Sequence, residues 1–242
     1  MSDNLDAVVG ALPQLWEGVL ITLQLTVGGI IGAFVIAIVL GLVVRSERWY
    51  LRVPARLLIE FFRGISLLVL LYVLFYVLPL FGVTFTGLFC GIFALSFNYG
   101  AYGAEVVRGA INNVPKGQWE VGTALSISPL HHMRRVIWPQ AWAIMLPSLS
   151  NLAVMLLKGT AVAYIILMHD LTWQTDILRS QTGSTFFSYG VGMVIYFLIS
   201  LVIVLLAQLL ERQAKRKLGQ GAPMKEMFDV QVAKPNPVVS GE

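Results

Sequence analysis

The feature that most constrains this chain is a run of apolar residues without a single charge, from Gly18 to Val44. As a helix rising 1.5 Å per residue, a run of this length crosses a hydrocarbon core of roughly 30 Å. Only 12% of the 242 residues are charged and 57% are hydrophobic, whereas about a quarter of a soluble domain is charged. The composition therefore excludes an ordinary soluble fold, a disordered chain and a fibre, and it favours a membrane protein.

Four more apolar stretches are long enough to cross a bilayer, at about Ile65–Phe81, Thr86–Val107, Ala141–Met168 and Phe186–Leu210. Because lipid offers backbone groups no hydrogen-bond partners, each stretch is expected to be a helix. The sequence thus predicts an all-α polytopic membrane protein with five transmembrane helices. No convincing internal repeat is present, and an odd number of spans argues against the duplicated halves of many secondary transporters.

The basic residues predict the orientation of these spans. No Lys or Arg precedes Arg45, and alternate loops are basic: five arginines follow within 45–63, the loop around 79–85 is uncharged, and the loop after the third span holds Arg108, Lys116, Arg134 and Arg135. The positive-inside rule then places the N-terminus outside and the C-terminus in the cytoplasm. We predict an external segment at 1–17, a permease domain at 18–212 and a flexible, Gly- and Pro-rich cytoplasmic tail at 213–242. The net charge of +4 follows from this topology rather than from nucleic-acid binding.

Residues for catalysis or metal binding are scarce. Cys90 is the one cysteine, so the chain has no intrachain disulfide and no C-x-x-C metal site. His131 and His132 are adjacent and cannot share a helix face, and we expect them to be solvated loop residues. The sequence contains neither a G-x-S-x-G elbow nor a G-x-x-x-x-G-K-[ST] phosphate loop. We therefore expect no catalytic residues, no metal and no cofactor in this chain.

The cytoplasmic loop at about 108–140 is the most informative segment. Pro115 and Gly117 predict a turn, after which QWEVGTAL forms a short helix with Glu120 in its first turn, where a carboxylate suits the helix dipole. Pro129 limits the helix on its far side. Small residues and the apolar Trp119 fit a helix that docks in a partner's groove. A surface helix that merely links two spans fits the same residues, and both interpretations stay open at this point.

This loop resembles the EAA signature of ABC importer permeases, which reads E-A-A, three residues, G, nine residues, I-x-L-P. The pattern falls on Glu120, Val121 and Gly122, then Ser126, then 136–139 ending in Pro139. Val121 and Gly122 replace the alanines, Ser126 replaces the glycine and Trp138 replaces the leucine. Ser126 makes the turn after the helix stiffer, since it does not freely take a positive φ.

Three flanking segments resemble the polar amino acid permeases in particular. They are EFFRGISLLVLLYVLFYVLP (60–79), FNYGAYGAEVVRGAINNVPKGQWE (97–120) and WPQAWAIMLPSLSNLAVMLLKGT (138–160). The resemblance implies a bacterial inner-membrane transport subunit, not an enzyme, that pairs with an identical or homologous permease chain. It also implies a cytoplasmic ABC ATPase dimer, which holds ATP and Mg, and an external or periplasmic solute-binding protein delivering an amino-acid-like substrate. The residues expected to couple to the ATPase are Gly117, Trp119, Glu120, Gly122, Ala124, Ser126 and Pro139.

The solute path is expected on the third and fourth spans. Lys158 lies inside the fourth span, where a charge is costly. It either faces the dimer interior and attracts a solute carboxylate, or it pairs with a carboxylate on the partner or with free helix carbonyls. The family pattern K-D-T has Gly159 in its middle position here, which puts a cation-binding role for this subunit in doubt. Other candidates for the path are Asn98, Tyr99, Asn151 and Thr160.

Charged residues near the cytoplasmic ends of the second and third spans suit a gate or an anchor. Glu105 and Arg108 are three residues apart on one helix face and predict an ion pair. Arg63 suits a topology anchor better than a gate. Gly28-x-x-x-Gly32 is a hypothesis for close helix packing. A secondary transporter or channel without an ATPase is the alternative function, although it would need acidic or His residues within the spans, and Glu105 is the one candidate.

Overall fold

The computed structural model describes residues 2–217, with side chains from Ala7 to Arg216, and every regular element among them is helical. The helices are α1 (Ser2–Val43), α2 (Trp49–Gly64), α3 (Leu67–Tyr72), α4 (Gly87–Asn112), α5 (Lys116–Ala124), α6 (Pro129–His132), α7 (Trp138–Thr160), α8 (Leu171–Thr182) and α9 (Thr185–Lys217). Residues 213–217 continue α9, whereas the remainder of the predicted tail, 218–242, lies outside the described residues.

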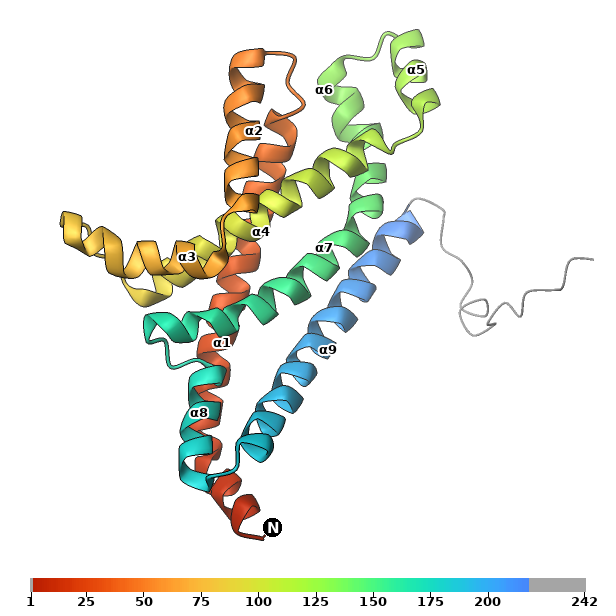
Figure 1. The fold of residues 1–242 in the computed structure, drawn as a ribbon. Helices are drawn as coiled ribbons and strands as arrows, with labels where there is room; N and C mark the ends of the chain where they lie inside the picture. The colour runs from red at the N-terminus through yellow and green to blue at the C-terminus, as the bar shows by residue number, and fades with distance from the viewer. Residues whose placement is uncertain (1, 218–242) are drawn as a thin grey trace, which may run out of the picture.

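Close packing of α1 against α4 forms the centre of the molecule, and α7 packs against both of these helices (Figure 1). Glycines make this approach possible. A Cβ on Gly28 would meet Ile92 at 2.7 Å, and a Cβ on Gly32 would meet Ser96 Oγ at 2.1 Å. The packing predicted for Gly28-x-x-x-Gly32 is therefore confirmed, because small residues let helix backbones come into contact within a membrane.

Two helices contain a π-helical segment followed closely by a proline. One segment covers Val73–Val77 ahead of Pro79, and the other covers Met133–Ile137 ahead of Pro139. A proline clashes with the carbonyl four residues earlier, and in both cases that carbonyl lies inside the widened turn. The wider turn removes the clash, so Pro139 is accommodated in a helix that continues into α7.

Three helical segments have the length and hydropathy of a membrane span, namely Ala7–Val43, Pro129–Ile166 and Thr185–Arg216. The pair α2 and α3 counts as a fourth if its bend of 98° is crossed by one span. The structure thus supports three to four candidate spans among the described residues. The expected third span corresponds to α4, which is not among these candidate spans. Asn98, the tyrosines and the charged residues near its end lower the mean hydropathy of α4.

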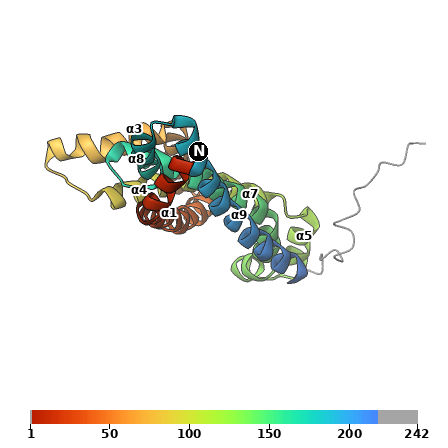
Figure 2. The same ribbon diagram turned by 90° about the horizontal axis from the view of Figure 1, so that it is seen from below.

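Span boundaries also differ from the expected ones. The fourth span was expected from Ala141, but the helix that contains it starts at Pro129, so part of the loop at 108–140 is helical. The residues between α1 and α3 were expected to be a loop, and Trp49–Gly64 form a 16-residue helix instead. Also unexpected is α8, which packs on the N-terminal part of α1 beside the start of α9 (Figure 2).

Candidate functional site

The loop between α4 and α7 presents the short helix α5 at one end of the molecule (Figure 1). Pro115 is the residue that precedes α5, so Glu120 lies in the second turn of the helix and not in the first, as expected from the sequence. Pro129 occupies the first position of α6, but α5 already ends at Ala124, so the expectation that Pro129 limits α5 is wrong. Gly117, Glu120 and Ala124 are exposed on α5, and exposure leaves this face accessible to a partner.

Ser126 ends α5 in the left-handed conformation, with φ 51°. Ile127 N donates to Gly122 O and Ser126 N donates to Thr123 O, both at 3.0 Å. This is the Schellman arrangement, whose left-handed position normally holds glycine. Ser126 therefore adopts the backbone conformation of the glycine it replaces, at the steric cost of its Cβ.

Gly122 is buried because the ring of His132 lies against it. A Cβ at this position would meet His132 Cε1 at 2.3 Å and Nδ1 at 2.4 Å. One ring nitrogen, Nε2, lies 2.9 Å from Gln118 O, and the ring meets Trp119 edge to face with centroids 5.9 Å apart. The expectation that His132 is a solvated loop residue is wrong, since it is 7% exposed. The His132 ring therefore packs against the buried side of α5. His131, by contrast, is exposed.

Trp119 connects α5 to the ends of two long helices. The guanidinium of Arg45, just after α1, stands 5.6 Å from the centre of the Trp119 ring, and it also donates to the side chain of Asn112 at the end of α4. Burial, and then repulsion by Arg108, lower the pKa of Arg45. Arg45 thus joins α5 to the ends of α1 and α4, and His132 joins it to the helix that leads into α7.

Two hollows flank Glu120. One is lined by Arg45, Asn112, Lys116 and Trp119, and the other by Gly122, Thr123, Pro129 and His132. Within the described residues the Glu120 carboxylate has no ion-pair partner. A carboxylate between two shallow hollows can meet a basic side chain of another protein, as a docking helix requires.

All five candidates for the solute path come from two adjacent helices, α4 and α7. Tyr99 of α4 donates its hydroxyl to Met155 O of α7 at 3.0 Å. On α7, Asn151, Met155 and Lys158 are exposed and follow one another at helical spacing, so they form one stripe. Thr160 is buried instead, and donates to Leu157 O at 2.7 Å. The structure thus places Tyr99 beside a stripe that holds Asn151 and Lys158.

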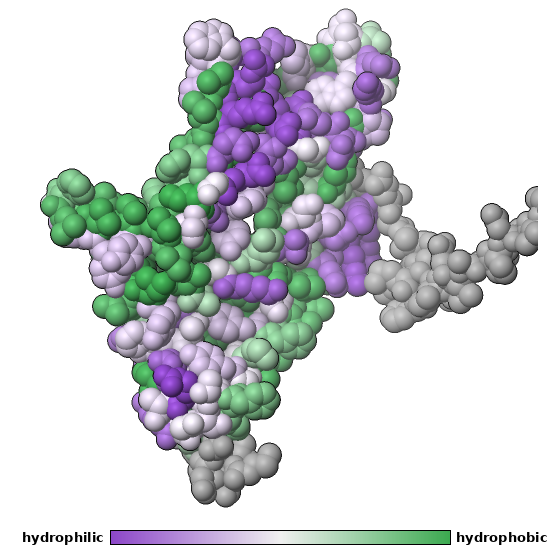
Figure 3. Space-filling view, viewed as in Figure 1, coloured by the Kyte–Doolittle hydropathy of each residue, from purple (hydrophilic) through white to green (hydrophobic). Residues whose placement is uncertain are grey.

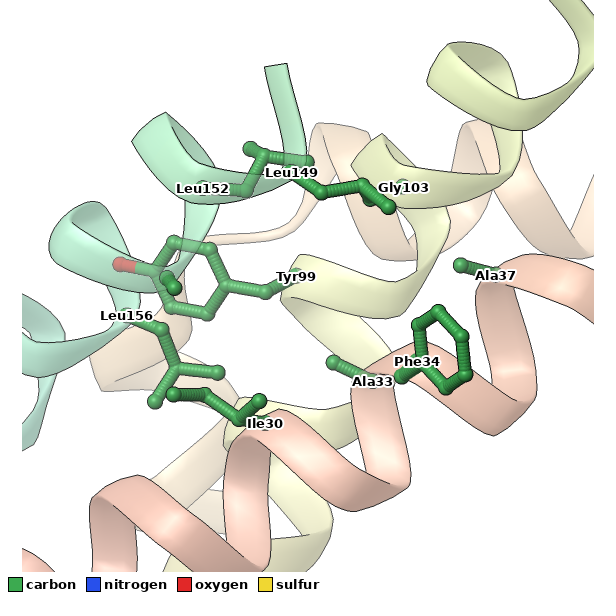
Figure 4. Close-up of a pocket in the computed structure, with 10 residues that line it drawn as sticks. Ile30, Ala33, Phe34, Ala37, Tyr99, Gly103, Leu149, Leu152 and Leu156 are labelled. Carbon is green, nitrogen blue, oxygen red and sulfur yellow. The ribbon is translucent and has the colours of Figure 1, made fainter. Parts of the chain in front are cut away.

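Tyr99 also explains the glycine at 159. A Cβ there would meet Tyr99 Oη at 2.5 Å, so the phenol occupies the space of a side chain at this position. The other face of Tyr99 borders an apolar groove between α1, α4 and α7, which Ile30, Phe34, Leu149, Leu152 and Leu156 line (Figure 4). The space that the acidic side chain of the family pattern would occupy at position 159 is thus filled by the Tyr99 hydroxyl.

Two side chains of α4, Asn98 and Tyr102, bond to the backbone at the bend between α2 and α3. Asn98 Nδ2 donates to Phe62 O at 2.9 Å and lies 3.5 Å from Ile65 O, and Tyr102 Oη donates to Arg63 O at 3.1 Å. These bonds satisfy carbonyls that the end of α2 leaves free. Asn98 therefore stabilises the bend rather than lining an open path. Tyr102 also bonds there, and no signal in the sequence indicated this role.

Glu105 and Arg108 form the expected ion pair, with Arg108 Nε 2.9 Å from Glu105 Oε2. Arg63 pairs more loosely with Glu60, at 3.7 Å, and its guanidinium stands 5.4 Å from the centre of the Tyr102 ring. In the described part of the chain, no group of three His, Cys, Asp or Glu is placed to hold a metal ion.

A buried polar cluster that sequence reasoning did not find surrounds Asp170 at the start of α8. Its carboxylate accepts a hydrogen bond from Trp173 N at 3.1 Å, and Tyr196 Oη of α9 lies 3.5 Å away. Thr22 of α1 accepts from Leu171 N at 3.1 Å. Burial raises the pKa of Asp170 to about 6. The only signal in the sequence is an Asp before a helix, which predicts a cap but not its burial.

Comparison with known proteins shows which sequences and structures this chain is similar to. Residues 33–216 match the family model described as binding-protein-dependent transport system inner membrane component. A probable amino-acid ABC transporter permease protein, y4tF of Sinorhizobium fredii, is 37% identical over 86% of this chain and 90% of its own length. The L-cystine transport system permease protein TcyB of Bacillus subtilis is 32% identical over 86% and 89%. The crystal structure of an amino acid ABC transporter with histidines aligns with a TM-score of 0.79 and 33% identity, over 85% of this chain and 96% of that chain.

Proposed function

The chain belongs to the family of binding-protein-dependent transport system inner membrane components, and from this we propose that α5 is the helix on which a cytoplasmic ATPase docks. The chain is a permease subunit of an ABC amino-acid importer and a multi-pass protein of the inner membrane. It is a transport subunit rather than an enzyme. The family implies an ATPase and a solute-binding protein as partners. ATP and Mg belong to the ATPase.

The observation that carries the proposal is the attachment of an exposed helix to three long ones. Trp119 contacts Arg45 beyond α1, Arg45 bonds to Asn112 of α4, and His132 lies between α5 and the helix that becomes α7. When the ATPase dimer closes on ATP, it moves α5, and these contacts carry the motion into the spans. The ATP-bound partner selects one state only if its contacts with α5 differ between the two states.

The proposed architecture has five spans, with the N-terminus outside and α5 in the cytoplasm. In favour of α4 as a span are its 26 residues and its burial between other helices, because a span that faces protein on most sides need not be uniformly apolar. The alternation of basic loops supports the orientation. Within this proposal, 1–17 is the external segment, 18–212 the permease domain and 213–242 the cytoplasmic tail.

The orientation has a direct chemical test. Thr123 is exposed on α5 and the single native cysteine, Cys90, is 0% exposed. A Thr123→Cys variant should react with a membrane-impermeant maleimide in inside-out vesicles and not in intact spheroplasts. Labelling from the outside would place α5 beyond the reach of any ATPase and would overturn the docking proposal.

A second permease chain, identical or homologous, is proposed to complete the translocation path. The best support is α9, whose most apolar window has none of its residues buried within a single chain. In the proposed path, Lys158 attracts the carboxylate of an amino-acid-like solute, and Tyr99 and Asn151 lie on the same surface. Amino-acid transport in the relatives, and the free Nζ of Lys158 among the described residues, favour this assignment.

Replacing Glu120 by Lys tests the coupling role. We expect uptake of polar amino acids by cells to fall at least about tenfold, since the reversed charge opposes its partner across the interface. ATPase activity of the reconstituted complex should no longer respond to the solute-loaded binding protein. The matched control is Glu47→Lys, an exposed acid between α1 and α2, which should retain uptake. Normal uptake in the Glu120 variant would refute the docking role, and uptake in vesicles lacking an ATPase would favour a secondary transporter.

A further inference from the structure

A charged cavity between the end of α1, α2 and α4 has no role in the proposed coupling. It has a volume of about 1100 Å³, including space open to solvent. The charged side chains that line it are Arg52, Arg56, Glu60, Arg63, Glu105 and Arg108. Four arginines face two glutamates, which leaves an excess of two positive charges, and this excess favours an anionic ligand.

Both glutamates are already paired. Glu105 is bound by Arg108 and Glu60 lies 3.7 Å from Arg63. Arg52 and Arg56, one turn apart on α2, are exposed and have no ion-pair partner within residues 7–216. Arg63 Nε is a buried donor without a hydrogen-bond partner, the single such side-chain atom in that range. The cavity therefore offers unused guanidinium donors as well as net charge.

A neighbouring side of α2 is apolar and uncovered. Ala55, Ile59 and Phe62 are buried against the core, whereas Leu57 and Phe61 are 66% and 58% exposed. In Figure 3, hydrophobic residues follow the outer edge of α2 and hydrophilic residues lie toward the cavity. A helix with a basic side next to an exposed apolar side matches a phospholipid, which is charged at one end and apolar along its chains.

We propose that this cavity binds the phosphate of an anionic phospholipid, with Arg52 and Arg56 as its principal ligands and the acyl chains along Leu57 and Phe61. A guanidinium group can donate two parallel hydrogen bonds to two oxygens of one phosphate. Basic pockets between membrane helices commonly hold lipid headgroups. The adjacent apolar side of α2 favours a lipid over free phosphate. The inference needs only the membrane location of the chain, so it is independent of the docking of an ATPase on α5.

Native mass spectrometry of the purified full-length permease tests this site. Phosphatidylglycerol and phosphatidylcholine are titrated onto the wild type and onto the Arg52→Gln, Arg56→Gln double variant. We expect the double variant to bind phosphatidylglycerol about tenfold more weakly, because two contacts to the phosphate are lost. The matched control is Arg134→Gln, Arg135→Gln, which removes the same charge from two exposed arginines outside the cavity and should bind like the wild type.

A conservative double variant separates charge from folding. Arg52→Lys, Arg56→Lys keeps both charges and should retain most of the preference for phosphatidylglycerol, even if the glutamine variant unfolds. Equal binding by wild type and glutamine variant, or no preference over phosphatidylcholine, would overturn the proposal. Displacement of the lipid by inorganic phosphate would assign the cavity to a soluble anion. Lipid binding unchanged by the glutamines, together with lost ATPase association, would assign it to a protein contact.

Discussion

Two short helices, α5 and α8, each join a pair of long helices at opposite ends of the molecule (Figure 1), yet they are held in different ways. At the start of α8, the Asp170 side chain caps Trp173 N, and Gly183 ends the helix with φ 65°. Four of its side chains are buried: Leu171, Gln174, Thr175 and Leu178. Within α5, Gly122 alone is buried, no side chain caps the start, and Ser126 ends the helix with φ 51°.

The contrast shows that one chain can hold two short helices to different extents, α8 by caps and burial and α5 mainly by a single buried glycine. Ordering a helix costs conformational entropy, and α8 offsets it with caps and burial. By contrast, α5 has one buried residue, Gly122, and no side-chain cap at its start. Helices that respond to partners come from the less stable parts of a structure.

The largest effect concerns Asp170 and pH. Burial raises the pKa of its carboxyl from 3.8 to about 6, so the folded chain holds the proton more tightly than the unfolded chain does. The resulting contribution to stability is complete below pH 3.8 and is lost as the pH rises through 6. The free energy of unfolding should therefore decrease by about 3 kcal/mol at most between pH 4 and pH 7, as thermal unfolding in detergent would measure.

An Asp170→Asn variant should flatten this pH profile and raise the stability at pH 7. Its amide oxygen still accepts from Trp173 N, but the side chain no longer ionises. Asp176 provides the control, since it lies half-buried on the same helix and hydrogen bonding to Arg179 lowers the pKa of its carboxyl. Asp176→Asn should leave the decrease between pH 4 and pH 7 in place. A profile that Asp170→Asn does not alter contradicts the prediction.

Gly18→Ala should loosen α8 from α1. The added Cβ would lie 2.7 Å from Gln174 Cγ and 3.0 Å from Asp170 O. Because a backbone atom cannot rotate away, we expect a loss of about 2 kcal/mol in thermal unfolding. Gly10→Ala, where no atom lies within 4 Å, should be neutral or slightly stabilising, since alanine favours helix. Equal behaviour of the two variants would mean that α8 is not held by this contact.

Gly122→Ala is the corresponding change in α5. The Cβ would meet the His132 ring at 2.3 Å, which lifts α5 or turns the ring, so uptake should fall about fivefold with a smaller loss of stability than Gly18→Ala. Gly109→Ala on α4 meets no atom within 4 Å and is the control. Adding His132→Ala to Gly122→Ala should restore part of the uptake. If it does not, the ring is not what positions α5.

The smallest effect is expected at Ser126. Its φ of 51° strains any residue with a Cβ, and glycine removes this strain while it makes the unfolded chain more flexible. Ser126→Gly should therefore stabilise the protein by about 0.5 kcal/mol and leave uptake near the wild-type level. Melting curves of the two proteins measured side by side would show it. Destabilisation would contradict the left-handed cap.

Local signals in the sequence predicted part of this molecule. The positions of Gly28 and Gly32 predicted close packing because that needs only spacing along one helix. The three-residue spacing of Glu105 and Arg108 predicted their ion pair for the same reason. By contrast, α8 was not predicted, because it has too few apolar residues to resemble a span. Trp49–Gly64 was predicted to be a loop because of its arginines, although Ala55, Ile59 and Phe62 follow a helical spacing.

By itself, the sequence determined that the chain is helical, lies in a membrane and resembles a known class of permease, because hydropathy, charge bias and motif spacing are properties of neighbouring residues. Only the tertiary structure decided that the His132 ring packs against Gly122, that Tyr99 occupies the space beside Gly159 and that the buried Asp170 lies beside Tyr196 of α9. These contacts join residues on different helices, and which helices meet depends on the packing of all of them at once.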